Sequence, residues 1–322
     1  MIRFDPAPWS IGPHRQTLLG YWYRYPLVWP HPVHDFVVEV EAEPDVRLLV
    51  RASWQERKEQ KPTLVVVHGL GGTSEGSYGL ALGRLAFARG WNVARMNMRS
   101  AGLGFAHCQR LYNAGLDGDL VAVLNAVART TPRLAVVGFS LGGNLAALAL
   151  GRSHAQLPAG LFAGAAVSPP LDLSACADAI DAPRNRLYSE NYVMQLRASY
   201  RSRQRLRPDL FEPGRELGLR TIREFDDRVT APYGGYAGAA EYYARSSAGP
   251  HMTAVEVPTL LLVAADDPMI PLDSVARWPR SAQVTLEITP TGGHVGFFAR
   301  AEAPGRFWAA DRVMEHLTAA AG

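Results

Sequence analysis

Short runs of β-branched and aliphatic residues alternate along this 322-residue chain with segments of helical periodicity, and this alternation restricts the possible folds more than any other feature. Runs such as TLVVV are continuous and apolar, as in strands that are buried on both faces. Strands are expected at 34–40, 46–51, 63–67, 91–96, 133–137, 161–167, 259–264 and 284–288, and helices at 78–89, 114–129, 141–151 and 307–317. Repeated strand–helix units form parallel sheets with helices on both faces. We therefore predict an α/β fold with a mostly parallel central sheet.

The alternation stops at about residue 168 and resumes near residue 250. The intervening sequence is rich in Arg, Tyr and Pro and contains no clear buried strand. A segment of this length between two sheet strands is too long for a loop. We interpret residues 172–250 as an inserted, mostly helical cap on a core that is built from residues 1–171 and 251–322. Within the cap, the basic stretch 197–207 is expected to be a solvated helix face, with a docking surface for an anionic partner or a membrane as the minority alternative.

Composition and charge exclude several other classes of protein. The chain is 48% hydrophobic, which is enough to bury a full core, and its net charge of +3 is small for a nucleic-acid binder. Two cysteines, Cys108 and Cys176, cannot form a disulfide framework and fit no zinc motif, so reduced thiols are expected. The first residues lack a signal-peptide pattern, and no apolar run approaches the roughly 20 residues that cross a bilayer. We expect a cytoplasmic protein with no nucleic-acid partner and no stable membrane insertion, and the sequence leaves its oligomeric state open.

One motif carries most of the chemical information. The sequence GFSLG at 138–142 follows a predicted strand directly and precedes a predicted helix directly. This context is that of a G-x-S-x-G nucleophile elbow, in which the serine backbone is strained and the glycines avoid clashes with neighbouring chain. The positive end of the helix dipole then favours an alkoxide. A chance Gly-Ser-Gly turn is the alternative, and the strand and helix flanks argue against it, so we predict Ser140 as a nucleophile.

A serine nucleophile needs a general base and an acid that orients the base. In the fold that carries such elbows, the chain order is serine, acid, histidine. His294 follows two glycines after the last predicted strand and is the predicted base. The predicted acid is Asp267, because its spacing to Pro271 is that of the usual acid loop. The neighbouring Asp266 is the alternative acid, and we interpret it as a carboxylate that caps the turn.

The negative charge that develops on an attacked carbonyl needs two backbone N–H donors. One predicted donor is Leu141, the residue after the nucleophile, and the other is Leu70, in the loop HGLGG at 68–72. We interpret the ring of His68 as a support that holds this loop through hydrogen bonds, rather than as a second catalytic histidine. No acid or histidine partner lies at metal-ligand spacing from it, so neither a metal nor a cofactor is expected.

Several further segments occur in an order typical of one known family. They are GPHRQT, HGLGG, RMNMRSAGLG, LYNAGLDGDL, GFSLGGN, FDDRVTAPYGGYAGAAEYY, ADDPMIP and GGHVGF. The chain resembles the type 4 branch of the α/β hydrolases, which includes bacterial proteins assigned as esterases, plant EMB8-like proteins, and mammalian esterase and acylglycerol-lipase relatives. The likeness extends from Gly12 to about His316. One departure is RSAGLG at 99–104, where the branch often has a cysteine-containing RGCGG-like loop.

The resemblance implies an α/β-hydrolase fold with an inserted cap and a triad of Ser140, Asp267 and His294. It also implies that residues 225–243 connect the cap to the core and are not catalytic apparatus. Both lines of argument predict a serine carboxylesterase that works through an acyl-enzyme. Because Leu, Tyr and Phe recur in the predicted cap, we expect a small-molecule ester substrate with an apolar acyl chain, either a short- to medium-chain ester or a monoacylglycerol-like one.

Two alternatives stay open. A thioesterase, amidase or acyltransferase would use the same triad and differ only in contacts to the leaving group or acceptor. A ligand-binding protein without enzymatic activity can also be built on a hydrolase scaffold, but such proteins arise by loss of a triad member, and all three predicted members are present here.

Overall fold

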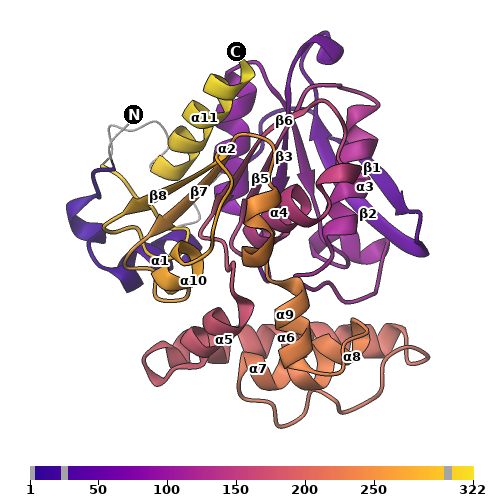
Figure 1. The fold of residues 1–322 in the computed structure, drawn as a ribbon. Helices are drawn as coiled ribbons and strands as arrows, with labels where there is room; N and C mark the ends of the chain where they lie inside the picture. Colours follow the sequence, from indigo (N-terminus) through magenta and orange to yellow (C-terminus); the bar gives the residue numbers. More distant parts are fainter. Residues whose placement is uncertain (1–3, 23–27, 301–306) are drawn as a thin grey trace.

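The computed structural model describes residues 4–22, 28–300 and 307–322. In this part of the chain, eight strands form one sheet in the order β1-β2-β4-β3-β5-β6-β7-β8 (Figure 1). The strands are β1 (His34–Val40), β2 (Glu43–Ser53), β3 (Thr63–Val67), β4 (Asn92–Met96), β5 (Leu134–Phe139), β6 (Leu161–Val167), β7 (Thr259–Ala264) and β8 (Val284–Thr289). Strand β2 runs antiparallel to β1 and to β4, and the other neighbouring pairs are parallel. The mostly parallel sheet that the sequence predicts is therefore confirmed.

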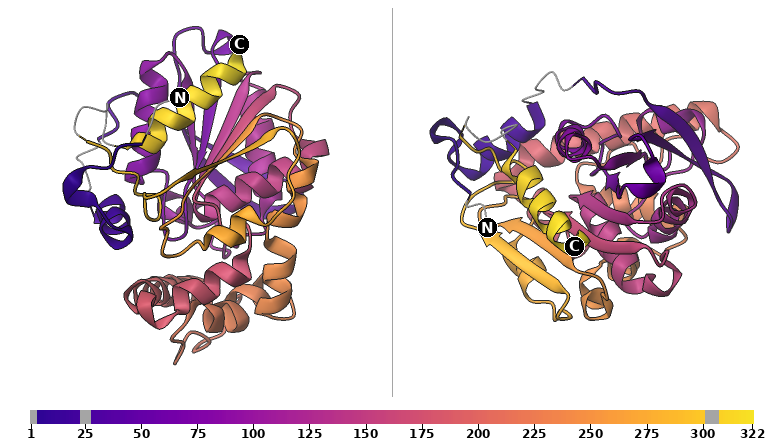
Figure 2. Two further views of the ribbon diagram at one scale, coloured as in Figure 1. Left: turned by 60° about the vertical axis from the view of Figure 1, so that its left-hand side comes forward. Right: turned by 90° about the horizontal axis from the view of Figure 1, so that it is seen from above.

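Helices cover both faces of the sheet because its central strands are apolar on both sides. The helices of the two layers are α2 (Ser77–Ala88), α3 (Asp117–Ala128), α4 (Leu141–Arg152) and α11 (Trp308–Ala321). Along β3, Leu64 and Val66 belong to one hydrophobic core together with α2 and α11, whereas Val65 and Val67 belong to a second core together with α3 and α4. This division follows from the alternation of side chains along a strand. Figure 2 shows α11 lying along one face of the sheet.

The predicted starts of two elements are wrong by three residues. The predicted turn at 43–45 belongs to β2, and the chain turns at 41–42 instead. The register between β1 and β2 is irregular here, with Glu39 opposite Arg47 and Val40 opposite Glu43. The helix that was expected at 114–129 begins only at Asp117, whose carboxylate is favoured at the positive end of a helix.

A group of helices lies beyond the edge of the sheet at which the parallel strands end (Figure 1 and Figure 2). The chain leaves the sheet after β6 and returns to it at β7. Between them lie α5 (Leu173–Asp181), α6 (Arg186–Leu206), α7 (Ile222–Phe225), α8 (Ala231–Tyr233) and α9 (Ala239–Ser246). These helices bury a small hydrophobic cluster of their own, formed by Tyr200, Phe211, Leu219, Phe225 and Val229.

Two further helices, α1 (Pro13–Trp22) and α10 (Leu272–Ala276), lie near the same edge of the sheet. Across the described ranges, no helix is both long enough and apolar enough to cross a membrane.

Candidate active site

Ser140 lies in a sharp turn between β5 and α4. Its backbone has φ 51° and ψ −122°, a region that residues other than glycine seldom occupy. The turn has no room for side chains on either side. A Cβ on Gly138 would overlap the carbonyl of Gly142, and a Cβ on Gly142 would overlap the carbonyl of His68. The two glycines of the GFSLG motif are therefore required by packing, and the serine is held at the first turn of α4.

The side chain of Asn144 anchors α4 next to this turn. Its Nδ2 donates to the carbonyl oxygens of Ala114 at 3.1 Å and Ser246 at 2.8 Å, and its Oδ1 accepts from the backbone N–H of Ala248 at 2.9 Å. Asn144 is fully buried, so these bonds are shielded from water. Ser246 is the last residue of α9. The amide therefore joins the helix that begins after Ser140 to the end of the helical segment.

The structure brings Ser140, His294 and Asp267 together in one chain of hydrogen bonds. His294 Nε2 lies 2.8 Å from Ser140 Oγ, and His294 Nδ1 lies 2.9 Å from Asp267 Oδ2. The other carboxylate oxygen of Asp267 accepts from the backbone N–H groups of Met269 at 2.8 Å and Ile270 at 3.0 Å. An ionised carboxylate can only accept, so Nδ1 carries the proton and Nε2 is free to accept one from the serine hydroxyl.

Asp266 faces a different group. Its Oδ1 accepts from the backbone N–H of Gly293 at 2.9 Å, which braces the loop that carries His294. Burial raises the pKa of this carboxyl, and the charge of the adjacent Asp267 adds to the effect. Within the described ranges, its Oδ2 is buried without a hydrogen-bond partner. The two neighbouring acids therefore diverge, with Asp267 on the imidazole and Asp266 on the loop backbone.

A second element of the site consists of two backbone N–H groups that have no acceptor among the described residues. In the loop after β3, Gly69 donates to the hydroxyl of Tyr78 at 2.9 Å, and Gly71 donates to the hydroxyl of Tyr112 at 2.9 Å. Between them, the N–H of Leu70 has no acceptor in the described part of the protein, and the same is true of Leu141 at the start of α4. Both leucines line the same cavity as the serine and the histidine. Their N–H groups are thus available to a ligand.

The ring of His68 holds this loop through hydrogen bonds to the backbone. The backbone N–H of Met98 donates to His68 Nε2 at 3.1 Å, so the ring proton is on Nδ1, which donates to the carbonyl of Gly69 at 2.8 Å. Burial lowers the pKa of His68 from 6.5 to about 4. The ring is therefore neutral at pH 7 and tied to the loop backbone, as the sequence suggests.

With the geometry established, the chain can be compared with known proteins. Residues 62–301 match the family of the α/β hydrolase fold. YheT of Escherichia coli (strain K12), a protein assigned as an esterase, is 33% identical over 278 residues, which cover 84% of this chain and 81% of YheT. The chain belongs to the α/β hydrolase fold family. This finding confirms the resemblance that the sequence motifs indicate.

Other relatives of the hydrolase are named as lipases. The monoacylglycerol lipase of Saccharomyces cerevisiae is 30% identical over 272 residues, and the phospholipase ABHD3 of Mus musculus is 30% identical over 245 residues. The aligned parts cover 80% and 74% of this chain but only 59% and 58% of those two proteins. The hydrolase therefore lies in an esterase- and lipase-like branch, and it spans less than two thirds of these eukaryotic relatives.

Solved structures share the fold at low sequence identity. The Pyrococcus furiosus esterase Pf2001 has a TM-score of 0.58 at 16% identity, covering 90% of this chain and 93% of that one. The 2,6-dihydroxy-pseudo-oxynicotine hydrolase has a TM-score of 0.60 at 20% identity, covering 95% of this chain and 73% of that one. These similarities confirm the α/β-hydrolase architecture.

The candidate active site of the hydrolase opens into a small cavity of about 110 Å³ between the sheet edge and the helical segment. Most of the lining is apolar, with Leu111, Leu141, Pro170, Leu173, Ala177, Ile180, Leu196, Ile222, Phe225, Met269 and Ile270. The lining also contains Arg203, Asp226 and Tyr243, which sequence reasoning did not assign to the site. The FDDRVT segment was the available signal for Asp226, whereas nothing in the sequence distinguishes Arg203 from the arginines beside it.

Asp226 is held by the hydroxyl of Tyr243, which donates to Asp226 Oδ2 at 2.8 Å. Enclosure by the protein raises the pKa of this carboxyl to about 6. Cys176 also lines the cavity, and burial raises the pKa of its thiol to about 12. Across the described ranges, no three side chains of the His, Cys, Asp and Glu types are grouped in a way that could hold a metal ion.

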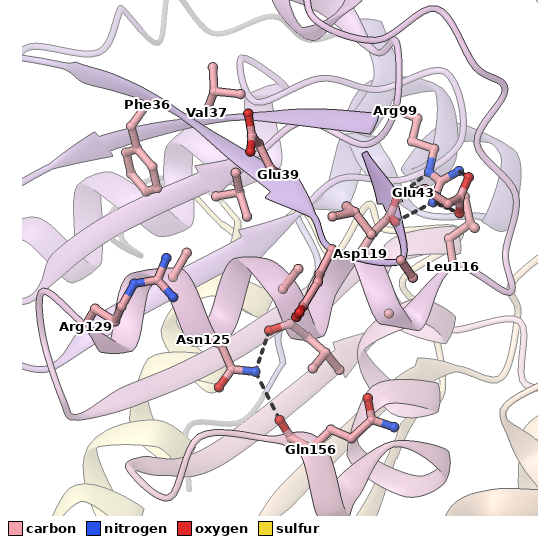
Figure 3. Close-up of a pocket in the computed structure, with 18 of the residues that line it drawn as sticks. Phe36, Val37, Glu39, Glu43, Arg99, Leu116, Asp119, Asn125, Arg129 and Gln156 are labelled. Atoms are coloured by element: carbon pink, nitrogen blue, oxygen red, sulfur yellow. Dashed lines mark hydrogen bonds and ion pairs between the residues drawn. The ribbon is translucent and has the colours of Figure 1, made fainter. Parts of the chain in front are cut away.

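A much larger open groove, of about 1440 Å³, lies between β1 and α3 (Figure 3). None of the residues of the hydrogen-bonded chain at Ser140 lines it. At one end, Arg99 forms a two-pronged ion pair with Asp119, with both N–O distances at 2.7 Å, and pairs with Glu43 at 2.7 Å. These pairs fix the segment after β4 to α3 and β2, and they place the single positive charge of Arg99 between two carboxylates.

Proposed function

We propose that the protein is a serine carboxylesterase and that Ser140, His294 and Asp267 form its catalytic triad. The observation that carries this proposal is the pair of short contacts, 2.8 Å and 2.9 Å, that join the serine hydroxyl, the imidazole and the carboxylate at the end of a cavity. The relatives named as esterases and lipases support the same reaction class.

The reaction begins when His294 Nε2 accepts the proton of the Ser140 hydroxyl and Oγ attacks the ester carbonyl carbon. The carbonyl oxygen becomes an oxyanion, to which the N–H groups of Leu70 and Leu141 donate. The protonated imidazole is stabilised by Asp267 and gives its proton to the departing alcohol, leaving an acyl-enzyme. Water then gives a proton to His294 and attacks the acyl carbon, and the carboxylic acid leaves as the proton returns to Oγ.

The alternative nucleophile at the cavity is Cys176. Its thiol lies 3.6 Å from the hydroxyl of Ser274, and burial raises its pKa to about 12. The thiolate is the nucleophilic form of cysteine, so this side chain is unreactive at neutral pH. The hydroxyl of Ser140, in contrast, is paired with a base. This difference in activation favours the serine.

The cavity supports a proposal for the substrate class. We propose that residues 172–250 act as a cap over a core of residues 1–171 and 251–322, and that the apolar lining holds the acyl chain. Burial of an acyl chain contributes about 0.8 kcal/mol per methylene group. The small volume favours short- to medium-chain esters or monoacylglycerol-like esters over long-chain ones.

A fluorophosphonate probe and a p-nitrophenyl butyrate assay test this proposal together. Wild-type protein is expected to be labelled and to hydrolyse the ester, and Ser140→Ala is expected to lose both properties while keeping its unfolding temperature. Ser202→Ala, an exposed serine on α6, is the matched control and is expected to behave as wild type. Undiminished labelling and turnover in Ser140→Ala would rule out the proposed nucleophile. The butyryl thioester and anilide, assayed beside the ester, distinguish esterase from thioesterase and amidase activity.

A further inference from the structure

A buried arginine lines the cavity of the candidate active site. Arg203 lies in the last turn of α6, its side chain is 1% exposed, and it lines the same cavity as Ser140 and His294. The basic stretch 197–207 was interpreted from the sequence as a solvated helix face. Arg203 departs from that interpretation, because this part of α6 packs against the core.

All hydrogen-bond partners of the Arg203 guanidinium are neutral. Its Nε donates to Ser100 Oγ at 3.1 Å, and Nη2 donates to the same hydroxyl. Its Nη1 donates to the carbonyl oxygen of Ser199 at 2.8 Å and also to the hydroxyl of that residue. The guanidinium also lies 5.6 Å from the centre of the Phe105 ring, which offers a weak attraction. In the described part of the chain, no carboxylate pairs with it, in contrast to the twofold pairing of Arg99.

The ionisable groups that act on the charge of Arg203 do not supply a negative charge either. They are the hydroxyl of Tyr112 and the thiol of Cys108, and burial raises the pKa of both. Burial lowers the pKa of Arg203 to about 10, so the guanidinium keeps its charge at pH 7. Asp226 lines the same cavity, but its hydrogen bond goes to Tyr243. A buried charge without a counter-ion destabilises a folded protein, so the presence of this charge beside a ligand cavity needs a reason.

We propose that Arg203 determines substrate specificity by binding an anionic group of the ester, either a phosphate or a carboxylate. This inference rests on the proposed function, because it names the class of ester that the same site accepts. The bonds to Ser100 and Ser199 use four of the five N–H groups of the guanidinium, so within the described part of the chain one N–H on Nη2 has no acceptor and can donate to an oxygen of either anion. The interaction is strengthened by the low dielectric of the cavity. The ester that the hydrolase prefers therefore carries a fixed negative charge in its acyl half or its alcohol half.

Two matched pairs of esters test this preference in the wild-type protein. For the alcohol half, 1-butyrylglycerol is compared with 1-butyrylglycerol 3-phosphate. For the acyl half, p-nitrophenyl heptanoate is compared with p-nitrophenyl hydrogen pimelate, after correction for spontaneous hydrolysis. We expect kcat/KM to be at least about tenfold higher for the charged member of one pair, and that pair identifies the half that carries the charge. Equal or lower values for the charged member in both pairs would overturn the inference.

Three variants then assign the preference to this side chain. Arg203→Gln is expected to reduce the charged-to-neutral ratio of kcat/KM to about one, and Arg203→Lys is expected to keep part of it. Arg205→Gln, which removes the same charge from an exposed position on the same helix, is expected to leave the ratio unchanged. If Arg203 only ties α6 to the segment of Ser100, both esters of a pair lose activity in proportion and the ratio does not move. That result would refute the specificity role.

A binding measurement separates this inference from the proposed function. Binding to the Ser140→Ala variant can be measured by calorimetric titration without turnover. The two probes are 1-butyrylglycerol 3-phosphate and p-nitrophenyl hydrogen pimelate. Binding of either anion that weakens at least about tenfold on adding Arg203→Gln supports the inference, even if folded wild-type protein hydrolyses no ester and the proposed function fails. The inference is contradicted if neither anion binds to the Ser140→Ala variant. It is also contradicted if the anions bind equally well to this variant and to the double variant that carries Arg203→Gln. If Arg203→Gln does not fold, the inference is judged from the charged-to-neutral ratios of kcat/KM in the wild-type protein and in Arg203→Lys.

Discussion

His68 makes the stability of the protein depend on pH in a way that its surroundings define. The ring is 2% exposed, accepts a backbone hydrogen bond at Nε2 and donates one at Nδ1. A protonated ring could not accept the bond from Met98 and would carry a charge in the core. The pKa is accordingly about 4 in the folded protein, against 6.5 ordinarily.

The sign and size of the effect follow from proton linkage. Above pH 6.5 the ring is neutral in both the folded and the unfolded chain, and its stabilising contacts are fully present. As the pH falls from 6.5 towards 4, the unfolded chain binds the proton and the folded protein does not, so the free energy of unfolding decreases. With these two pKa values the decrease is about 2 kcal/mol between pH 7.5 and pH 5.

Urea denaturation of wild type and His68→Gln at several pH values from 7.5 to 5 isolates this effect, because all other titrating groups cancel in the difference. At pH 7.5 the variant should be less stable by about 1–3 kcal/mol, since the flexible side chain of glutamine holds its donor and acceptor in place less well than the rigid ring does. The difference should then shrink by about 2 kcal/mol as the pH falls to 5. His107→Gln, at an exposed histidine, is the control and should show a constant difference. A difference that stays constant for His68→Gln would refute the argument.

Two further predictions concern the acid of the triad and the packing of the turn. Asp267→Asn should lower ester turnover by about 10⁴-fold because the amide favours the wrong imidazole tautomer, whereas Asp266→Asn should keep most of the turnover. Steady-state assays of both purified variants check this, and the reverse ranking would move the acid by one residue. Gly142→Ala should destabilise the protein severely because its Cβ would overlap backbone atoms, whereas Gly118→Ala, which has open space in α3, should gain about 1 kcal/mol from helix propensity. Thermal unfolding of the two variants measures this contrast. Equal unfolding temperatures would contradict the prediction and show that the turn at Ser140 can rearrange to accept a Cβ.

The sequence predicts those parts of the site that depend on local chain geometry. Ser140 lies in a turn whose strand, glycines and helix are adjacent in the sequence, and His294 lies on a loop at the same edge of the sheet. Once the parallel order of the strands is established, these residues must meet, and the structure places them 2.8 Å apart. From the sequence, only the spacing to Pro271 favours Asp267 over Asp266 as the acid that contacts the histidine. The opposite orientations of the two side chains depend on the conformation of the loop, which the sequence does not show.

Arg203 could not be found in this way. It lies among exposed arginines, and a helix with so many charges is typical of a solvated surface. Its burial arises because α6 packs against the segment of Ser100, more than one hundred residues earlier in the chain. The start of β2 could not be found for a similar reason, since the sequence at 43–45 suggests a turn locally, whereas its place in a strand depends on the irregular pairing with β1.

The buried amide of Asn144 has a mechanical consequence for the helical segment. Through its bonds to Ser246 and Ala248, the returning arm of the helical segment is fastened to α4, the helix that begins beside the nucleophile. The helical segment therefore cannot move away from the sheet as a rigid body without breaking these buried hydrogen bonds. The same amide joins α9 to the first turn of α4, so the position of the returning arm is linked directly to the turn that carries Ser140.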